Sequence, residues 1–162
     1  MKSNGTHAPA AGQERPFQAF ENFPLFRGVP QEVLLVLFVG ATEMLCRKGQ
    51  IIVQEGDPGE ELFIIGTGSA DVVMGHGTAG ETVLATLQAG DCFGEMCVIE
   101  PTLRSATVVA REGTLLYGIK STTLQKVYHF WPQQQAVIMA NFALTLAERV
   151  RTLDPLYFDR AF

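Results

Sequence analysis

The chain has 162 residues, of which 47% are hydrophobic and 18% charged, enough for one globular domain but too few for a binding domain joined to a separate catalytic domain. Its formal net charge of -5 argues against general electrostatic binding to nucleic acids or anionic membranes. The longest apolar run, Val33 to Val39, is far shorter than the roughly 20 residues that cross a bilayer. Three cysteines without a metal-ligand spacing, and no signal peptide ahead of them, favour a reducing cytoplasm.

The first elements in chain order are a tail and a helical lead-in. Residues 1–15 are rich in small and polar residues, so we predict a flexible tail there. Residues 17–38 contain closely spaced aromatic side chains, and Pro30 precedes a run that suits a short helix with proline at its first turn. We therefore expect N-terminal helices that pack on the rest of the domain.

Residues 41–120 consist of short strand-like runs separated by turn residues. These runs are ATEMLC, QIIVQ, ELFIIGTG, SADVVMG, ETVLATL, ATVVA and TLLYGI. Strands of about five residues with Gly, Asp or Pro between them are typical of a sandwich or barrel. The fold class predicted is mainly β, an eight-stranded jelly-roll β-sandwich.

Residues 121–153 are predicted to be helical. STTLQKVYHF is followed by Pro132 and a long stretch whose apolar residues recur at three- or four-residue steps, as in one helix with an apolar stripe. Asp154 and Pro155 should end this long C-terminal helix, leaving residues 154–162 as a tail. The domain would thus span residues 16–153.

The segment from Phe93 to Val108 carries the chemistry. Gly94 and Glu95 stand at the start of a short helical pattern, and Arg104-Ser105-Ala106-Thr107 leads into the next strand. Backbone N–H groups at a helix start, together with an arginine, predict a pocket for a phosphate. A carboxylate beside a phosphate would repel it unless it faced a donor, and a ribose hydroxyl would be that donor for Glu95.

This segment resembles the phosphate-binding cassette of the cyclic-nucleotide-binding domain family. In that family Phe-Gly-Glu precedes two or three apolar residues, a variable stretch, and then Arg, a small residue and Ala. The turns at Gly49, Gly56-Asp57, Gly68 and Gly90-Asp91 also resemble the family, and the likeness covers about Phe20 to Arg151. Two departures are Leu103, where many members have Pro, and Cys97, where Ala is common.

The resemblance implies a set of ligand contacts. Glu95 would accept a hydrogen bond from the ribose 2′-hydroxyl, Arg104 would pair with the cyclic phosphate, and the Ser105 hydroxyl would touch the phosphate and reach a purine edge. The expected nucleotide-binding residues are Phe93, Gly94, Glu95, Met96, Cys97, Arg104, Ser105 and Ala106. Val72 and Ala85 would line the base, and the last helix would close over it with Phe142, Thr145, Leu146 or Arg149.

The predicted function is a cytoplasmic cyclic-nucleotide sensor that binds cAMP or cGMP, is not an enzyme, and signals by rearrangement of its C-terminal helix. No metal or cofactor is expected, because His7, His76 and His129 show no metal-ligand spacing. We expect no effector domain after the last helix. The apolar helix stripe and the aromatic residues after it favour a homodimer or an unidentified effector protein as partner.

Three alternatives stay open at this point. A jelly-roll interaction domain would keep the scaffold without the ligand, and a related receptor would bind a cyclic dinucleotide. A cupin-type enzyme would share the roll but needs a His/Glu metal set on neighbouring strands, and the β region contains one histidine.

Overall fold

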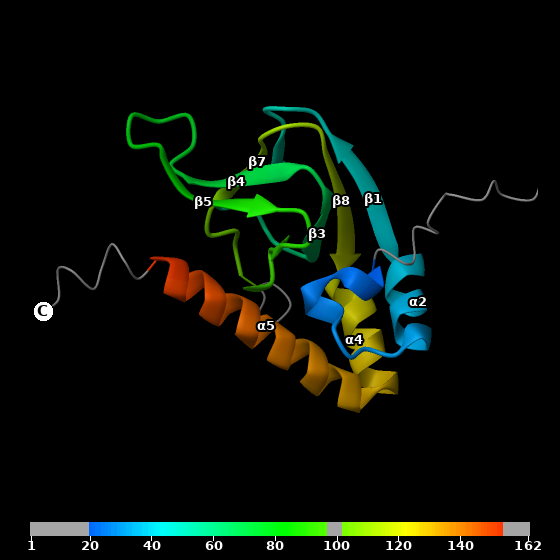
Figure 1. The fold of residues 1–162 in the computed structure, drawn as a ribbon. Helices are drawn as coiled ribbons and strands as arrows, with labels where there is room; N and C mark the ends of the chain where they lie inside the picture. The colour runs from blue at the N-terminus through cyan, green and yellow to red at the C-terminus, as the bar shows by residue number, and fades with distance from the viewer. Residues whose placement is uncertain (1–19, 97–101, 154–162) are drawn as a thin grey trace, which may run out of the picture.

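The computed structural model describes residues 20–96 and 102–153, which include eight strands (Figure 1). The strands are β1 (Ala41–Cys46), β2 (Ile51–Val53), β3 (Glu61–Thr67), β4 (Ser69–Met74), β5 (Thr82–Gln88), β6 (Cys92–Phe93), β7 (Thr107–Ala110) and β8 (Thr114–Lys120). They form two four-stranded sheets, in the orders β1-β8-β3-β6 and β2-β7-β4-β5. The predicted eight-stranded sandwich is confirmed.

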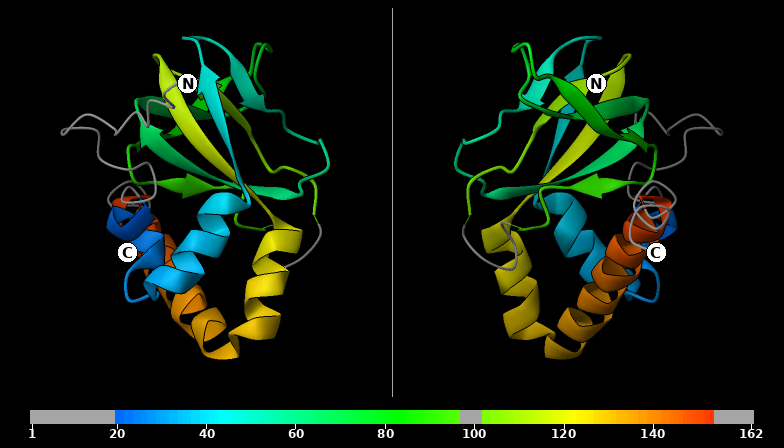
Figure 2. Two further views of the ribbon diagram at one scale, coloured as in Figure 1. Left: turned by 90° about the vertical axis from the view of Figure 1, so that its right-hand side faces the viewer. Right: turned by 90° about the vertical axis from the view of Figure 1, so that its left-hand side faces the viewer.

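In the described part of the chain, the helical elements that accompany the strands include η1 (Pro24–Phe26), α2 (Gln31–Val39), α4 (Ser121–Phe130) and α5 (Pro132–Leu153). Figure 2 shows the helices gathered at one end of the sandwich. They pack against the sheet β1-β8-β3-β6, which we call the helix-side sheet, through buried residues such as Leu37, Leu124 and Ile138. The side-chain amide of Asn141 in α5 donates to the carbonyls of Leu25 and Arg27, both at 2.9 Å, and thereby ties α5 to η1.

Strand β3 shows why this sequence forms a sheet covered on both faces. Side chains alternate across a strand, so Leu62 and Ile64 point to one face and Phe63 and Ile65 to the other. The first pair packs with the helices, and the second packs inside the sandwich. Because both faces are covered, the strand is a continuous apolar run rather than an alternating one.

The predicted elements agree with the structure apart from one short strand. The runs 41–46 and 121–130 coincide with β1 and α4, and the other predicted runs differ from their elements by one residue at one or both ends. Strand β6 was not predicted, because two residues carry no pattern. It pairs with β3 through Phe93 opposite Phe63 and Cys92 opposite Ile64.

Two predicted regions lie outside the described residues, namely the tails at 1–15 and 154–162. Of the helices in the described part of the chain, none combines the length and the apolar character needed to cross a membrane.

Candidate functional site

A cavity of about 120 Å³ lies where the sheet β2-β7-β4-β5, called here the cavity-side sheet, meets the predicted cassette and the end of α5. Three valines form an apolar row along its wall, because Val108 pairs with Val53 on one side and with Val72 on the other. The full lining is Val53, Val72, Leu87, Phe93, Gly94, Glu95, Met96, Thr102, Leu103, Arg104, Ser105, Ala106, Val108 and Arg149. The charged side chains in this lining are Glu95, Arg104 and Arg149.

The backbone around Arg104 is fixed by the turn that contains Gly56 and Asp57. The Arg104 N–H donates to the Asp57 carbonyl at 2.8 Å, and the Gly56 N–H donates to the Arg104 carbonyl at 2.9 Å. The guanidinium Nη2 donates to the Glu61 carbonyl at 2.9 Å, and its central carbon lies 5.7 Å from the centroid of the Phe63 ring. The cation is therefore positioned by a hydrogen bond and by an aromatic face.

The absence of a side chain at Gly94 allows the Arg104 guanidinium to lie close to the backbone of the cassette. Its φ of +76° belongs to the left-handed region that glycine adopts readily. A Cβ at this position would overlap Nη1 of Arg104 and would lie 2.8 Å from the carbonyl oxygen of Glu61. The glycine in the Phe-Gly-Glu motif is thus required by close approach as well as by conformation.

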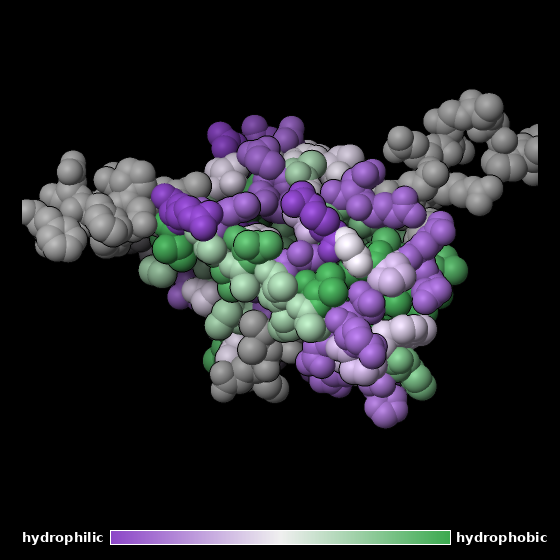
Figure 3. Space-filling view, turned by 60° about the horizontal axis from the view of Figure 1, so that its bottom comes forward, coloured by the Kyte–Doolittle hydropathy of each residue, from purple (hydrophilic) through white to green (hydrophobic). Residues whose placement is uncertain are grey.

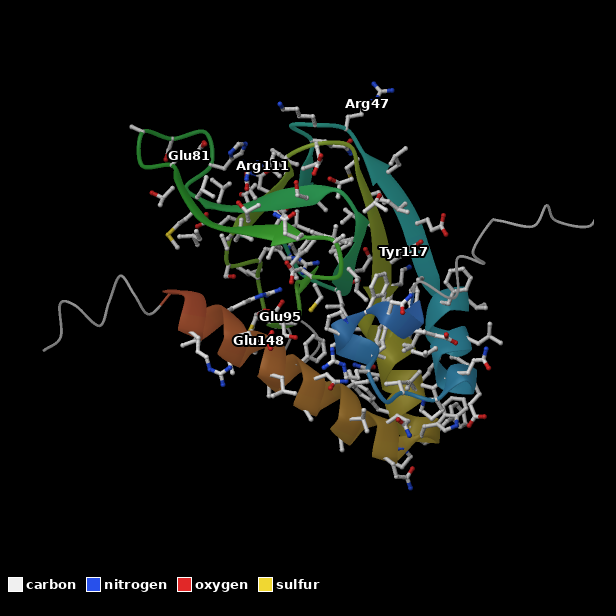
Figure 4. All side chains as sticks on the ribbon, in the orientation of Figure 1. Arg47, Glu81, Glu95, Arg111, Tyr117 and Glu148 are labelled. Carbon is white, nitrogen blue, oxygen red and sulfur yellow. The ribbon has the colours of Figure 1, made fainter. Side chains whose placement is uncertain are left out.

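Glu95 is 9% exposed and is the one charged residue among the buried residues in the described part of the chain. Its Oε1 lies 3.6 Å from Nη1 of Arg149, which comes from the far end of α5. Nη2 of the same arginine donates to the carbonyl of Cys92. Figure 4 shows Glu95 between the strands and α5, with Glu148 on the helix below it. The end of α5 therefore meets the cassette through one arginine.

The Cys92 side chain is 3% exposed and packs in the apolar core beside this site. Burial raises the pKa of its thiol to about 12; nearby Arg149 lowers it, and the carboxylates of Glu95 and Asp91 raise it. A thiol with this pKa stays protonated at neutral pH, and the thiolate is the reactive form.

The predicted cassette residues that the structure describes all line the cavity. Phe93 and Ala106 are buried, and Met96 and Ser105 are exposed at its edge. Cys97 lies outside the described residues.

Of the residues predicted to contact the base or form the lid, some line the cavity and others do not. Val72 and Arg149 line the cavity. Ala85 pairs with Val72 but is exposed and is not part of the lining, where Leu87 from the same strand takes its place. Phe142 belongs to the helical core, since α5 lies on the helix-side core before it reaches the cavity.

The other two lid candidates, Thr145 and Leu146, are half-buried and lie outside the lining of the cavity. The Thr145 hydroxyl donates to the carbonyl of Asn141 at 3.0 Å, which keeps it on its own helix. Ligand contact by Ala85, Phe142, Thr145 and Leu146 stays a prediction.

Several lining residues were missed by sequence reasoning. Val53, Leu87 and Val108 are apolar strand residues whose alternation could have placed them on the inward face. Thr102 and Leu103 fall in the variable stretch of the cassette, where no pattern identifies a contact. Leu103 also forms an isolated antiparallel bridge with Pro58 and is 63% exposed.

Comparison with known proteins identifies the family of this chain. The family model described as "Cyclic nucleotide-binding domain" matches residues 43–129, which run from β1 into α4 and include the cassette. The chain belongs to the cyclic nucleotide-binding domain family. The resemblance read from the cassette residues is confirmed.

Relatives of this cyclic nucleotide-binding domain come from several kinds of protein. A cyclic AMP receptor protein of Thermus thermophilus is 33% identical over 143 residues, which are 85% of this chain and 64% of the relative. A cAMP-dependent protein kinase regulatory subunit of Dictyostelium discoideum is 30% identical over 115 residues, which are 71% of this chain and 35% of the relative. The chain thus spans less than two thirds of either relative.

Solved structures agree with the fold. A cyclic nucleotide-binding domain from Methylobacillus flagellatus superposes with a TM-score of 0.79 at 22% identity, covering 90% of this chain and 84% of that one. The Thermus thermophilus catabolite activator protein gives 0.68 at 29% identity, covering 84% of this chain and 62% of that one. Both support the same arrangement of sandwich and helices.

Proposed function

We propose that this cyclic nucleotide-binding domain is a cytoplasmic sensor that binds cAMP or cGMP in the cavity at the cassette and catalyses no reaction. The observation that carries the proposal is one cavity that combines a positioned guanidinium, a buried carboxylate and an apolar wall. Arg104 would form charge-assisted hydrogen bonds with the cyclic phosphate. Glu95 would accept a hydrogen bond from the ribose 2′-hydroxyl.

The rest of the nucleotide would meet the apolar wall and the edge of the cavity. Val72 and Leu87 offer the base an apolar surface, and the Ser105 hydroxyl can donate or accept at a phosphate oxygen or a purine edge. A hydroxyl with both capacities fits adenine and guanine alike. The relatives named for cAMP make cAMP the first ligand to test.

The signal would be a change in α5. A ligand shifts a conformational equilibrium only by the difference between its affinities for the two states. Since α5 contributes Arg149 to the cavity and is joined to η1 through Asn141, it connects the site to the N-terminal helical segment. Movement of α5 would therefore change the helical end of the molecule.

The partner that receives the signal would be a second copy of the chain or an effector protein. Leu144 and Val150 on α5 are 60% and 59% exposed, which leaves apolar surface for an interface. Figure 3 shows the side of the molecule that carries α5, with hydrophobic residues gathered on it.

Thermal melting with cAMP, cGMP and a cyclic dinucleotide tests the proposal. A ligand at a hundred times its Kd adds about 2.7 kcal/mol to the native state, which raises Tm by roughly 5–11 °C for a chain of this size. Arg104→Ala should weaken binding about 10- to 150-fold, since a hydrogen bond to a charged group contributes ~1.5–3 kcal/mol.

Arg47→Ala provides the matched control, because Arg47 is exposed and lies at the opposite end of the sandwich from Glu95 (Figure 4). It should leave the ligand-induced shift unchanged. The proposal is wrong if none of the three ligands raises Tm, or if the shift in Tm is unchanged in Arg104→Ala. A shift with the dinucleotide alone would favour that ligand class instead.

A further inference from the structure

The side chain of Arg149 lies in the cavity and contacts the carboxylate that a ribose would need. Its Nη1 is 3.6 Å from Oε1 of Glu95, and the two side chains are 28% and 12% exposed. Because Glu95 is almost buried, the cavity is the side from which a ligand can approach it, and Arg149 is part of the cavity lining. The guanidinium therefore stands where a ligand hydroxyl would arrive.

Helix α5 is anchored well before it reaches this point. Ile138 and Phe142 are 0% and 2% exposed in the helical core, and Asn141 donates to two carbonyls of the N-terminal segment. Beyond Phe142 the helix exposes Leu144, and it continues below the strands in Figure 1. Its C-terminal turns are thus an overhanging part that contacts the cassette through Arg149.

The small volume of the cavity agrees with a binding site that is partly occupied by a side chain of the chain itself. Pockets for drug-sized ligands enclose roughly 300–1,000 Å³, whereas this cavity measures about 120 Å³. Arg149 is the lining residue that comes from α5. A nucleotide could enter after this side chain and the overhanging turns had moved.

We infer that Arg149 is a latch: in the empty protein it holds the last turns of α5 over the site by binding Glu95, and the nucleotide must displace it. This inference rests on the proposed function, since the displaced contact is the one assigned to the ribose 2′-hydroxyl. It differs from the lid expected from the sequence, in which Arg149 would close over a bound base. In a latch, loss of the arginine strengthens binding. In a lid, it weakens binding.

The test compares Arg149→Gln with Arg151→Gln, which removes an exposed charge two residues further along the helix. Calorimetric titration with cAMP should show a Kd about two- to fivefold lower in Arg149→Gln and unchanged in Arg151→Gln, given the usual strength of partly exposed ion pairs. Titration with 2′-deoxy-cAMP should show a gain of similar size, because this nucleotide also enters only after Arg149 has moved. Unchanged or weaker cAMP binding in Arg149→Gln overturns the latch.

Hydrogen exchange in the ligand-free protein separates the latch from the proposed function. Amides after Leu144 in α5 should exchange about two- to fivefold faster in Arg149→Gln than in Arg151→Gln. If wild type binds neither cAMP nor cGMP, the proposed function fails and exchange alone decides whether Arg149 holds α5. Faster exchange in Arg149→Gln then supports the latch, and equal exchange in the two variants overturns it.

Discussion

Alanine at position 94 tests how the cassette backbone positions Arg104. The residue would have to keep a φ of +76°, and a non-glycine residue in the left-handed region costs about 1–2 kcal/mol. Its Cβ would also overlap Nη1 of Arg104 and approach the Glu61 carbonyl to 2.8 Å, and overpacking of this kind costs about 1–3 kcal/mol. We expect Gly94→Ala to lower the free energy of unfolding by about 2–5 kcal/mol and to weaken nucleotide binding at least tenfold through displacement of the guanidinium.

Gly77→Ala is the matched control. Gly77 has the same φ of +76°, and a Cβ there would meet nothing within 4 Å, so this variant measures the conformational cost alone, about 1–2 kcal/mol. Urea unfolding gives both free energies if the m-value is unchanged, and calorimetry gives the nucleotide Kd. Equal losses of stability in the two variants, or full binding by Gly94→Ala, would refute the role given to the close approach of Gly94 and Arg104.

Three further substitutions test the packing around the site and the core. Burial raises the pKa of Cys92 from 9.0 to about 12, so the unfolded state loses the thiol proton first and wild-type stability should fall as pH rises above 9. In Cys92→Ala the urea midpoint should fall less steeply between pH 9 and 10 than in wild type. Equal slopes in the two proteins would contradict this. The Tyr128 hydroxyl is buried without a hydrogen-bond partner among the described residues, so Tyr128→Phe should leave Tm unchanged or raise it, and a clear decrease would count against that reading. The Thr114 hydroxyl is fully buried and donates to the Ser69 carbonyl at 2.9 Å, so Thr114→Val should cost about 1–3 kcal/mol in urea unfolding; a neutral result would show that this bond contributes little.

The sandwich was predictable because its strands and turns leave local signals. The run 61–68 reads as a strand, and the structure explains its unbroken hydrophobicity by two cores, one on each face. Strand β6 could not be predicted, since its two residues form a strand only because β3 lies beside them. Whether such short segments form strands depends on pairing with residues far away in the sequence. Local sequence patterns do not reveal this pairing.

The cassette was predictable for a similar reason, and the lid was not. Glu95 and Arg104 stand in one contiguous motif, so their meeting in a cavity follows from a short segment of chain. Which turn of α5 reaches that cavity depends on how the helix crosses the sandwich. Helical spacing alone made Phe142 and Arg149 equally good candidates for the lid. In the structure Phe142 is buried in the helical core, and Arg149 lines the cavity.

The bond between Asn141 and Leu25 has a consequence for the order in which the chain is made. Its two residues are 116 positions apart, and at a translation rate of about 5–20 residues per second the second appears roughly 6–23 s after the first. During that time the aromatic cluster of Phe20, Phe23 and Phe26 has been synthesised without the helix that covers it. On the ribosome this cluster is therefore an exposed apolar segment, open to chaperones, until α5 emerges and completes the core.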